Sequence, residues 1–75
     1  MKAYVLIEVE MGHAEDVTDA IRQMPGVISA DATFGIYDLI VIAEVGSVRD
    51  LGALLRRDIQ CIPGVRSTST CLCVD

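Results

Sequence analysis

The chain has 75 residues, of which 52% are hydrophobic and only 4% aromatic, and its formal net charge is −5. A chain of this length forms one domain, and a domain this small buries only about 60% of the surface that its unfolded chain exposes. The chain has more apolar residues than such a core can hold, so some apolar surface is expected to contact a partner. Six Lys and Arg residues with few aromatics exclude the basic, stacking surface that binds nucleic acid. With three cysteines, no secretory h-region and no membrane-length apolar run, we expect a reduced, cytoplasmic protein that contacts no membrane.

The first half of the chain predicts a strand, a helix and a second strand. The first strand covers residues 3–10 and stops before Gly12. A helix follows over residues 14–24, because apolar side chains recur there at helical spacing. Pro25-Gly26 ends this helix, since proline cannot continue it and glycine accepts the positive φ of a turn. A second strand is predicted over residues 27–34.

The second half begins with a tight reversal at Gly35-Ile36 and a third strand over residues 37–45. Ser47 is a good N-cap for a second helix, with Asp50 three positions later as a variant of the capping box. A last strand covers residues 65–74. The buried stripe of the second helix is predicted to hold Val48, Leu51, Leu55, Ile59 and Ile62.

An internal repeat relates the two halves. Pro25-Gly26-Val27 recurs as Pro63-Gly64-Val65, and the first strand aligns with the third up to a shared Glu-x-Gly ending. The two offsets differ by about one helical turn, so the second helix is expected to be the longer one. Two such units give an α+β, ferredoxin-like βαββαβ fold, with a four-stranded antiparallel sheet and two helices on one face.

The other face of that sheet is also apolar. In the first strand Val5 and Ile7 point one way, yet Tyr4 and Leu6 point the other. A face in contact with water would instead carry alternating polar residues. The simplest cover for this face is a second copy of the chain, so we expect a homodimer joined sheet to sheet.

Catalytic chemistry is hard to find in this sequence. The single histidine, His13, has no nucleophile or paired acid near it in the pattern and is interpreted as a solvated helix-start residue. Cys71 and Cys73 lie on one face of a strand, unlike the C-x-x-C loops that hold metals, and we interpret them as buried, small apolar side chains, with a metal or redox site that involves Cys61 as the alternative. We expect no enzyme activity, no catalytic residues, no metal site and no cofactor.

A polar cluster is the more interesting candidate site. The hairpin segment Gly35-Ile36-Tyr37-Asp38 and the strand segment Thr68-Ser69-Thr70 combine turn amides, hydroxyls and a carboxylate. Amides and hydroxyls suit the carboxylate of a small zwitterion, and Asp oxygens suit its ammonium group.

These residues resemble the ligand-sensing domain of the Lrp/AsnC family of transcriptional regulators. The resemblance covers essentially the whole chain. It rests on Ala3-Tyr-Val-Leu-Ile, Met24-Pro-Gly-Val27, Phe34-Gly-Ile-Tyr-Asp38, Ile62-Pro-Gly-Val65 and Thr68-Ser-Thr70, in this order and spacing.

The resemblance implies a single effector-binding domain over residues 1–75 without the helix-turn-helix domain of full-length members. It implies sheet-to-sheet dimers that assemble into octamer- or decamer-like rings, with a free amino acid bound between dimers. Phe34 replaces the threonine that usually precedes the hairpin glycine, and this bulk narrows the expected pocket. The site residues that the resemblance implies are Gly35, Tyr37, Asp38, Thr68, Thr70 and Asp58.

The leading hypothesis is therefore a non-enzymatic amino-acid sensor that acts in transcription regulation, reaching DNA only through a partner such as a full-length Lrp/AsnC-type regulator. Three alternatives stay open: an ACT-like regulatory module that pairs edge to edge, a purely structural oligomerisation domain, and a small dimeric α/β-barrel enzyme of the monooxygenase type. The last needs a deep pocket between sheet and helices, lined by a residue such as His13.

Overall fold

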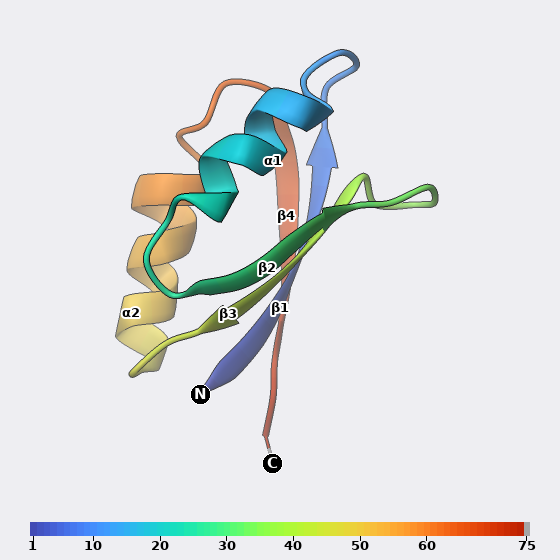
Figure 1. Ribbon diagram of the computed structural model, residues 1–75. Coiled ribbons are helices and arrows are strands. Elements are labelled where there is room, and N and C mark those ends of the chain that lie inside the picture. The colour runs from blue at the N-terminus through green and yellow to red at the C-terminus, as the bar shows by residue number, and fades with distance from the viewer. Residues whose placement is uncertain (75) are drawn as a thin grey trace.

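The computed structural model describes residues 1–74 and shows a four-stranded antiparallel sheet with its helices against one face (Figure 1). The strand order is β2-β3-β1-β4, so β1 and β3 are central and β2 and β4 are the edges. This confirms the ferredoxin-like βαββαβ fold predicted from the sequence. The elements are β1 (Lys2–Val9), α1 (Ala14–Arg22), β2 (Val27–Ala32), β3 (Leu39–Glu44), α2 (Val48–Ala53), η1 (Leu54–Ile59) and β4 (Val65–Leu72).

The two Pro-Gly-Val turns dock in equivalent ways. The carbonyl of Gly26 accepts the backbone N–H of Glu44 at 2.8 Å, and that of Gly64 accepts the N–H of Glu10 at 2.7 Å. These glutamates are matched residues of the sequence repeat, each at the end of a central strand. Both glycines have positive φ, +89° and +100°, and a Cβ on Gly64 would lie 2.5 Å from the Cβ of His13. Glycine is therefore needed at the second turn for space as well as for conformation.

The second helix changes its hydrogen-bonding pattern along its length. Ser47 is its N-cap, as predicted, and its side chain accepts the N–H of Asp50 at 3.1 Å. After six α-helical residues the chain continues as the π-helical segment η1, also six residues long. The two segments together exceed the nine residues of α1, in agreement with the longer second helix predicted from the repeat.

The π-helical turn alters which side chains face inward. Because a π-helix bonds residues five apart, Leu54 and Ile59 both become buried. The predicted stripe omitted Leu54, and it was wrong at Val48, which is 61% exposed at the first position of α2.

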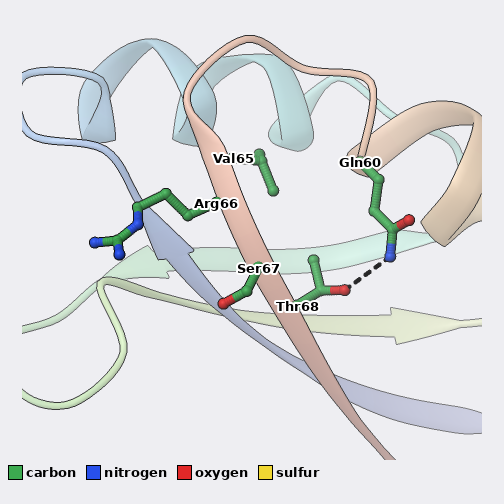
Figure 2. A pocket seen from close by; sticks show the side chains of 5 residues that line it. All are labelled: Gln60, Val65, Arg66, Ser67 and Thr68. Atoms are coloured by element: carbon green, nitrogen blue, oxygen red, sulfur yellow. Dashed lines mark hydrogen bonds between the residues drawn. The ribbon is translucent and has the colours of Figure 1, made fainter.

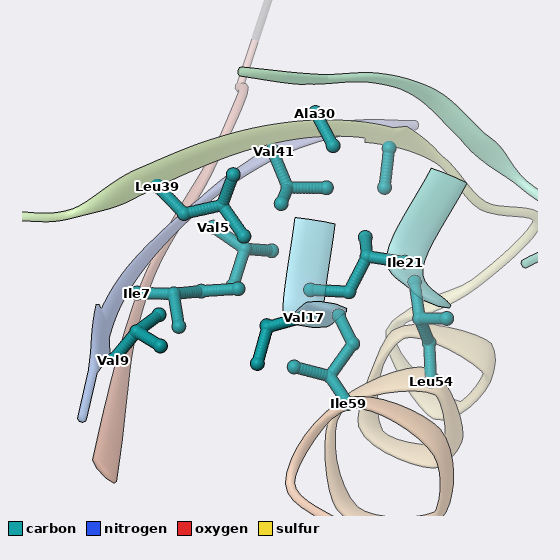
Figure 3. Close-up of a cluster of buried hydrophobic side chains, with 11 residues drawn as sticks. Val5, Ile7, Val9, Val17, Ile21, Ala30, Leu39, Val41, Leu54 and Ile59 are labelled. Atoms are coloured by element: carbon teal, nitrogen blue, oxygen red, sulfur yellow. The ribbon is translucent and has the colours of Figure 1, made fainter. Parts of the chain in front are cut away.

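One aliphatic cluster fills the space between the sheet and the helices (Figure 3). Val5, Ile7 and Leu39 point into it from the central strands, and Val17 and Ile21 enter from α1. No aromatic side chain belongs to this buried cluster. Fully burying an aliphatic side chain of this size stabilises a fold by about 1.5–3 kcal/mol, so this one layer holds all the elements together.

The opposite sheet face has no covering helix, and we call it the open face. The register places Tyr4 beside Ile42 and Leu6 beside Ile40 on this face. These four side chains are half-buried by their neighbours alone. The prediction that the second sheet face is also apolar is thus confirmed, because the central strands present apolar side chains on both faces.

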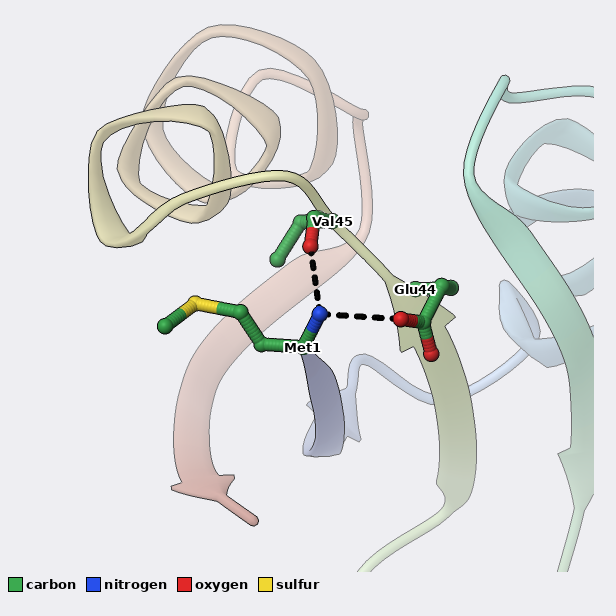
Figure 4. A network of polar contacts seen from close by, with 3 residues as sticks. All are labelled: Met1, Glu44 and Val45. Atoms are coloured by element: carbon green, nitrogen blue, oxygen red, sulfur yellow. Dashed lines mark hydrogen bonds and ion pairs between the residues drawn. The ribbon is translucent and has the colours of Figure 1, made fainter. Parts of the chain in front are cut away.

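The start of β1 is attached to the end of β3 by polar contacts (Figure 4). The terminal ammonium of Met1 donates to the Glu44 carboxylate and to the Val45 carbonyl, each at 2.8 Å. Both partners of the ion pair are partly exposed, so the pair contributes at most about 1 kcal/mol.

Among the described residues, no helix is long and apolar enough to cross a membrane.

Candidate functional site

The loop between β2 and β3 is closed by specific hydrogen bonds at its neck. The Thr33 N–H donates to the Asp38 carbonyl at 2.9 Å, and the Thr33 hydroxyl donates to the Tyr37 carbonyl at 2.8 Å. The reversal predicted at Gly35-Ile36 is therefore wider than expected, because these bonds leave residues 33–38 outside both strands.

Asp38 fastens this loop to the end of β1. Its side-chain Oδ2 accepts the N–H of Val9 at 2.8 Å, and its own N–H donates to the Ile7 carbonyl at 2.9 Å. The ladder between β1 and β4 shifts register at Glu8 and Val9, so the carboxylate satisfies a backbone donor next to a bulge. The candidate ligand residue Asp38 thus has a structural contact of its own.

The tip of the same loop is strongly apolar. The side chain of Phe34 is fully exposed and that of Ile36 is 86% exposed. The loop projects well beyond the helices and the rest of the sheet as an arm (Figure 1). Because the hydrogen bonds at the neck order its base, the arm presents two large side chains to solvent from a fixed position.

Thr68 and Thr70 lie on the helix side of the edge strand β4. The register sets Thr68 beside Ile7 and Thr70 beside Val5, whose side chains face the core. The shared face predicted for the two threonines is therefore confirmed. Both are half-buried, at the margin of the core rather than inside it.

A cavity of about 380 Å³ opens at the start of β4 (Figure 2). Gln60 reaches it from the end of the second helix, and its Nε2 donates to the Thr68 hydroxyl at 3.0 Å. On the other side of the strand, the Ser67 hydroxyl donates to a Glu8 carboxylate oxygen at 2.9 Å. The cavity is thus lined by amide and hydroxyl groups and by the basic residue Arg66, which can hydrogen-bond a small polar ligand.

A second cavity, of about 390 Å³, lies where the first Pro-Gly turn meets α2 and η1. Its lining includes Asp50, Arg57 and Asp58, and the Arg57 Nε lies 3.8 Å from an Asp58 oxygen. The lining of this cavity therefore contains both positively and negatively charged side chains.

The predicted site residues are divided among three places. Gly35, Tyr37 and Asp38 lie in the arm or at its base, Thr68 and Thr70 lie on β4, and Asp58 lines the second cavity. The Asp38 N–H donates to the Ile7 carbonyl, and Thr68 pairs with the same Ile7 across the ladder between β1 and β4. Strand β1 therefore lies between the arm and β4. Two strand spacings amount to about 10 Å, too far for one small ligand group to touch both segments within a single chain.

Of the residues that line the cavity at β4, the sequence predicted only Thr68 and missed Gln60, Val65, Arg66 and Ser67. A glutamine near the end of a helix carries no distinctive pattern, and its contact with Thr68 becomes visible only in three dimensions. Within the described residues, no group of three or more His, Cys, Asp or Glu side chains is arranged to hold a metal ion. His13 is exposed and lines neither cavity.

Comparison with protein families gives a match over nearly the whole chain. The model of the Lrp/AsnC ligand binding domain matches residues 2–75. No curated protein sequence matches this chain.

Solved structures reproduce the fold closely. FFRP-DM1 is 30% identical with a TM-score of 0.92, and the similarity covers 97% of each chain. The protein TTHA0845 from Thermus thermophilus is 27% identical with a TM-score of 0.95, covering 99% of this chain and 92% of that one. The transcriptional regulator NMB0573 from Neisseria meningitidis, solved in complex with L-Met, is 18% identical with a TM-score of 0.89. It is matched over 99% of this chain and 49% of its own, a likeness of fold alone.

Substitution of Asp38 tests its structural contact. Asp38→Ala leaves the Val9 N–H without its partner, so we expect the free energy of unfolding to fall by about 1–3 kcal/mol in urea denaturation at fixed chain concentration. Asp38→Asn keeps an acceptor oxygen and should lose clearly less. Equal losses in both variants would show that the negative charge, not the hydrogen bond, matters at this position.

Proposed function

Because this chain belongs to the Lrp/AsnC ligand-binding domain family, we propose that it is a non-enzymatic amino-acid-binding and oligomerisation domain that acts in transcription regulation. The family match over residues 2–75 is the observation that carries this proposal. The chain has a net charge of −5, so its action on DNA goes through a partner protein, such as a full-length regulator of the same family, in a mixed assembly.

The open face is the proposed dimer interface. Leu6, Ile40 and Ile42 form an aliphatic strip across the two central strands, flanked by Tyr4. A two-fold contact would bury this strip against its own copy and exclude water from both. The hydrophobic contribution to the free energy of dimerisation is about 25 cal/mol per Å² of apolar surface removed from water.

The arm is the proposed contact between dimers. Phe34 and Ile36 are large, exposed apolar side chains, and the arm that carries them projects beyond the rest of the sheet (Figure 1). Burial of these side chains by a neighbouring dimer would join dimers into rings of the octamer or decamer type.

The ligand site is proposed to lie between chains. The arm residues Gly35, Tyr37 and Asp38 of one chain would meet Thr68 and Thr70 of a neighbour, which removes the separation seen within one chain. The Neisseria regulator was solved with L-Met, and a free amino acid is the ligand that we propose here. Asp58 would contribute only where the assembly brings the second cavity to the arm.

The dimer interface is tested with a charge at its centre. Ile42→Lys should convert the dimer to monomer in size-exclusion chromatography with light scattering, because a buried ammonium without a partner is costly. Gln23→Lys adds the same charge at an exposed position at the end of α1 and should stay dimeric. A monomeric wild type, or an Ile42→Lys variant that remains dimeric, would refute the open face as the interface.

Ligand binding is tested by thermal shift with each of the twenty amino acids at millimolar concentration. At about 100 times Kd, the ligand should stabilise the protein by about 2.7 kcal/mol. Thr70→Val should abolish the response, whereas Ser69→Ala, a neighbouring change on the open face, should retain it. No response to any amino acid in the wild type would leave only the structural oligomerisation role.

A further inference from the structure

Two of the three cysteines lie two residues apart at the end of the sheet: Cys71 is in β4 and Cys73 directly follows its last residue. Cys71 lies beside Tyr4 in the register, and the backbone N–H of Cys73 donates to the Lys2 carbonyl at 2.8 Å. This hydrogen bond extends the pairing with β1 one residue past the ladder, so strand alternation puts both thiols on the side that faces away from the helices. We propose that Cys71 and Cys73 bind one soft monovalent metal ion per chain, of the Cu(I) class, as a two-coordinate dithiolate.

The spacing of the two cysteines disfavours a disulfide between them. Side chains two residues apart on a strand are separated by about 6.7 Å along its axis. A disulfide needs Cβ atoms about 3.5–4.5 Å apart, which this extended backbone does not provide. All three cysteines are free thiols in the structure.

The same spacing suits two sulfurs that share a metal ion. Two metal–sulfur bonds of about 2.3 Å span about 4.6 Å between the sulfur atoms. Thiols on parallel Cα–Cβ vectors reach this separation when their side chains lean toward each other, without any change in the backbone. The backbone therefore places the two thiols where a change of rotamer alone gives a chelating geometry.

The small number of ligands selects the kind of ion. Structural Zn²⁺ and iron–sulfur clusters take four ligands, and within the described residues no third His, Cys, Asp or Glu completes such a set here. Soft thiolates favour Cu(I), which is satisfied by two of them. Binding releases both thiol protons and leaves a complex with one net negative charge.

Lys2 supplies a compensating positive charge. Its ammonium lies 5.2 Å from the centre of the Tyr4 ring. A lysine ammonium is charged at neutral pH. Lys2 therefore places a positive charge over Tyr4, which is the register neighbour of Cys71.

In a single chain, the pair is accessible to an ion from solution. The burial predicted for both thiols was wrong, because Cys71 is exposed and Cys73 is half-buried at an uncovered edge of the sheet. They lie at the margin of the open face, whereas the aliphatic strip runs along the two central strands. Metal binding here requires neither an amino-acid ligand nor the arm.

Cys61 provides a matched internal control. It follows η1, and its thiol donates to the Arg56 carbonyl at 3.4 Å, so it belongs to a different part of the molecule. A lone exposed thiol reacts with soft ions but cannot chelate them. The proposal therefore predicts that only two of the three cysteines matter.

The test is an anaerobic Cu(I) titration of the reduced full chain against a chromophoric Cu(I) chelator, with native mass spectrometry for stoichiometry. Wild type and Cys61→Ser should each bind one Cu(I) per chain. Cys71→Ser and Cys73→Ser should each lose about a hundredfold or more in affinity, since each removes the chelate effect. Cys71→Ala and Cys73→Ala, with circular dichroism, check that the loss does not come from unfolding.

Two results would overturn the proposal. One is equal loss of binding in all three single-cysteine variants, which would indicate independent reaction of isolated thiols. The other is wild-type affinity in Cys71→Ser or Cys73→Ser. Neither result bears on amino-acid binding, so the two proposals fail separately.

Discussion

The pairing of β1 with β3 places apolar side chains on both faces of the same two strands, and the rest of the molecule follows from this arrangement. Val5, Ile7 and Leu39 are buried beneath the helices, while Leu6 and Ile40 are neighbours on the opposite side. Two helices can cover only one face of the sheet. The chain thus forms a complete core and still presents a second apolar layer, which is the basis of the proposed dimer.

The duplicated architecture keeps the frame symmetric and leaves the site asymmetric. Gly26 and Gly64 each accept a hydrogen bond from the end of a central strand, so the two turns are equivalent in folding. The strands that follow them differ. The first leads into the apolar arm around Phe34, and the second leads directly to the threonines of β4. Binding chemistry is therefore expected where the repeat breaks down, and the two unequal segments are separated by β1 within one chain.

The fold could be predicted from the sequence because the signals for it are local. Period-2 alternation, helical spacing, the Ser47 cap and the two Pro-Gly turns each fix an element without reference to its neighbours. The π-helical segment was not predictable, because Leu51, Leu55 and Ile59 recur at the four-residue spacing of an ordinary helix. The structure instead buries Leu54 with Ile59, which lie five residues apart. The width of the 33–38 loop depends on the hydrogen bonds that Thr33 donates to the carbonyls of Tyr37 and Asp38. These are tertiary contacts, which no sequence pattern predicts.

The candidate site could be predicted only as a set of residue types. Thr68 and Thr70 share a face because strand alternation requires it, and the structure confirms this. The backbone contact of Asp38, the position of Asp58 in a separate cavity and the contribution of Gln60 all depend on tertiary packing. The proposed site between chains would leave in each chain only part of its hydrogen-bonding groups.

Our central claim is that the uncovered sheet face and the arm drive an assembly that an amino acid completes. Native mass spectrometry at micromolar chain concentration, with and without a pool of amino acids, reads assembly size and bound ligand in one spectrum. We predict only even-numbered assemblies, with mass increments of bound amino acid when the pool is present. A spectrum dominated by the bare monomer under both conditions would contradict the claim.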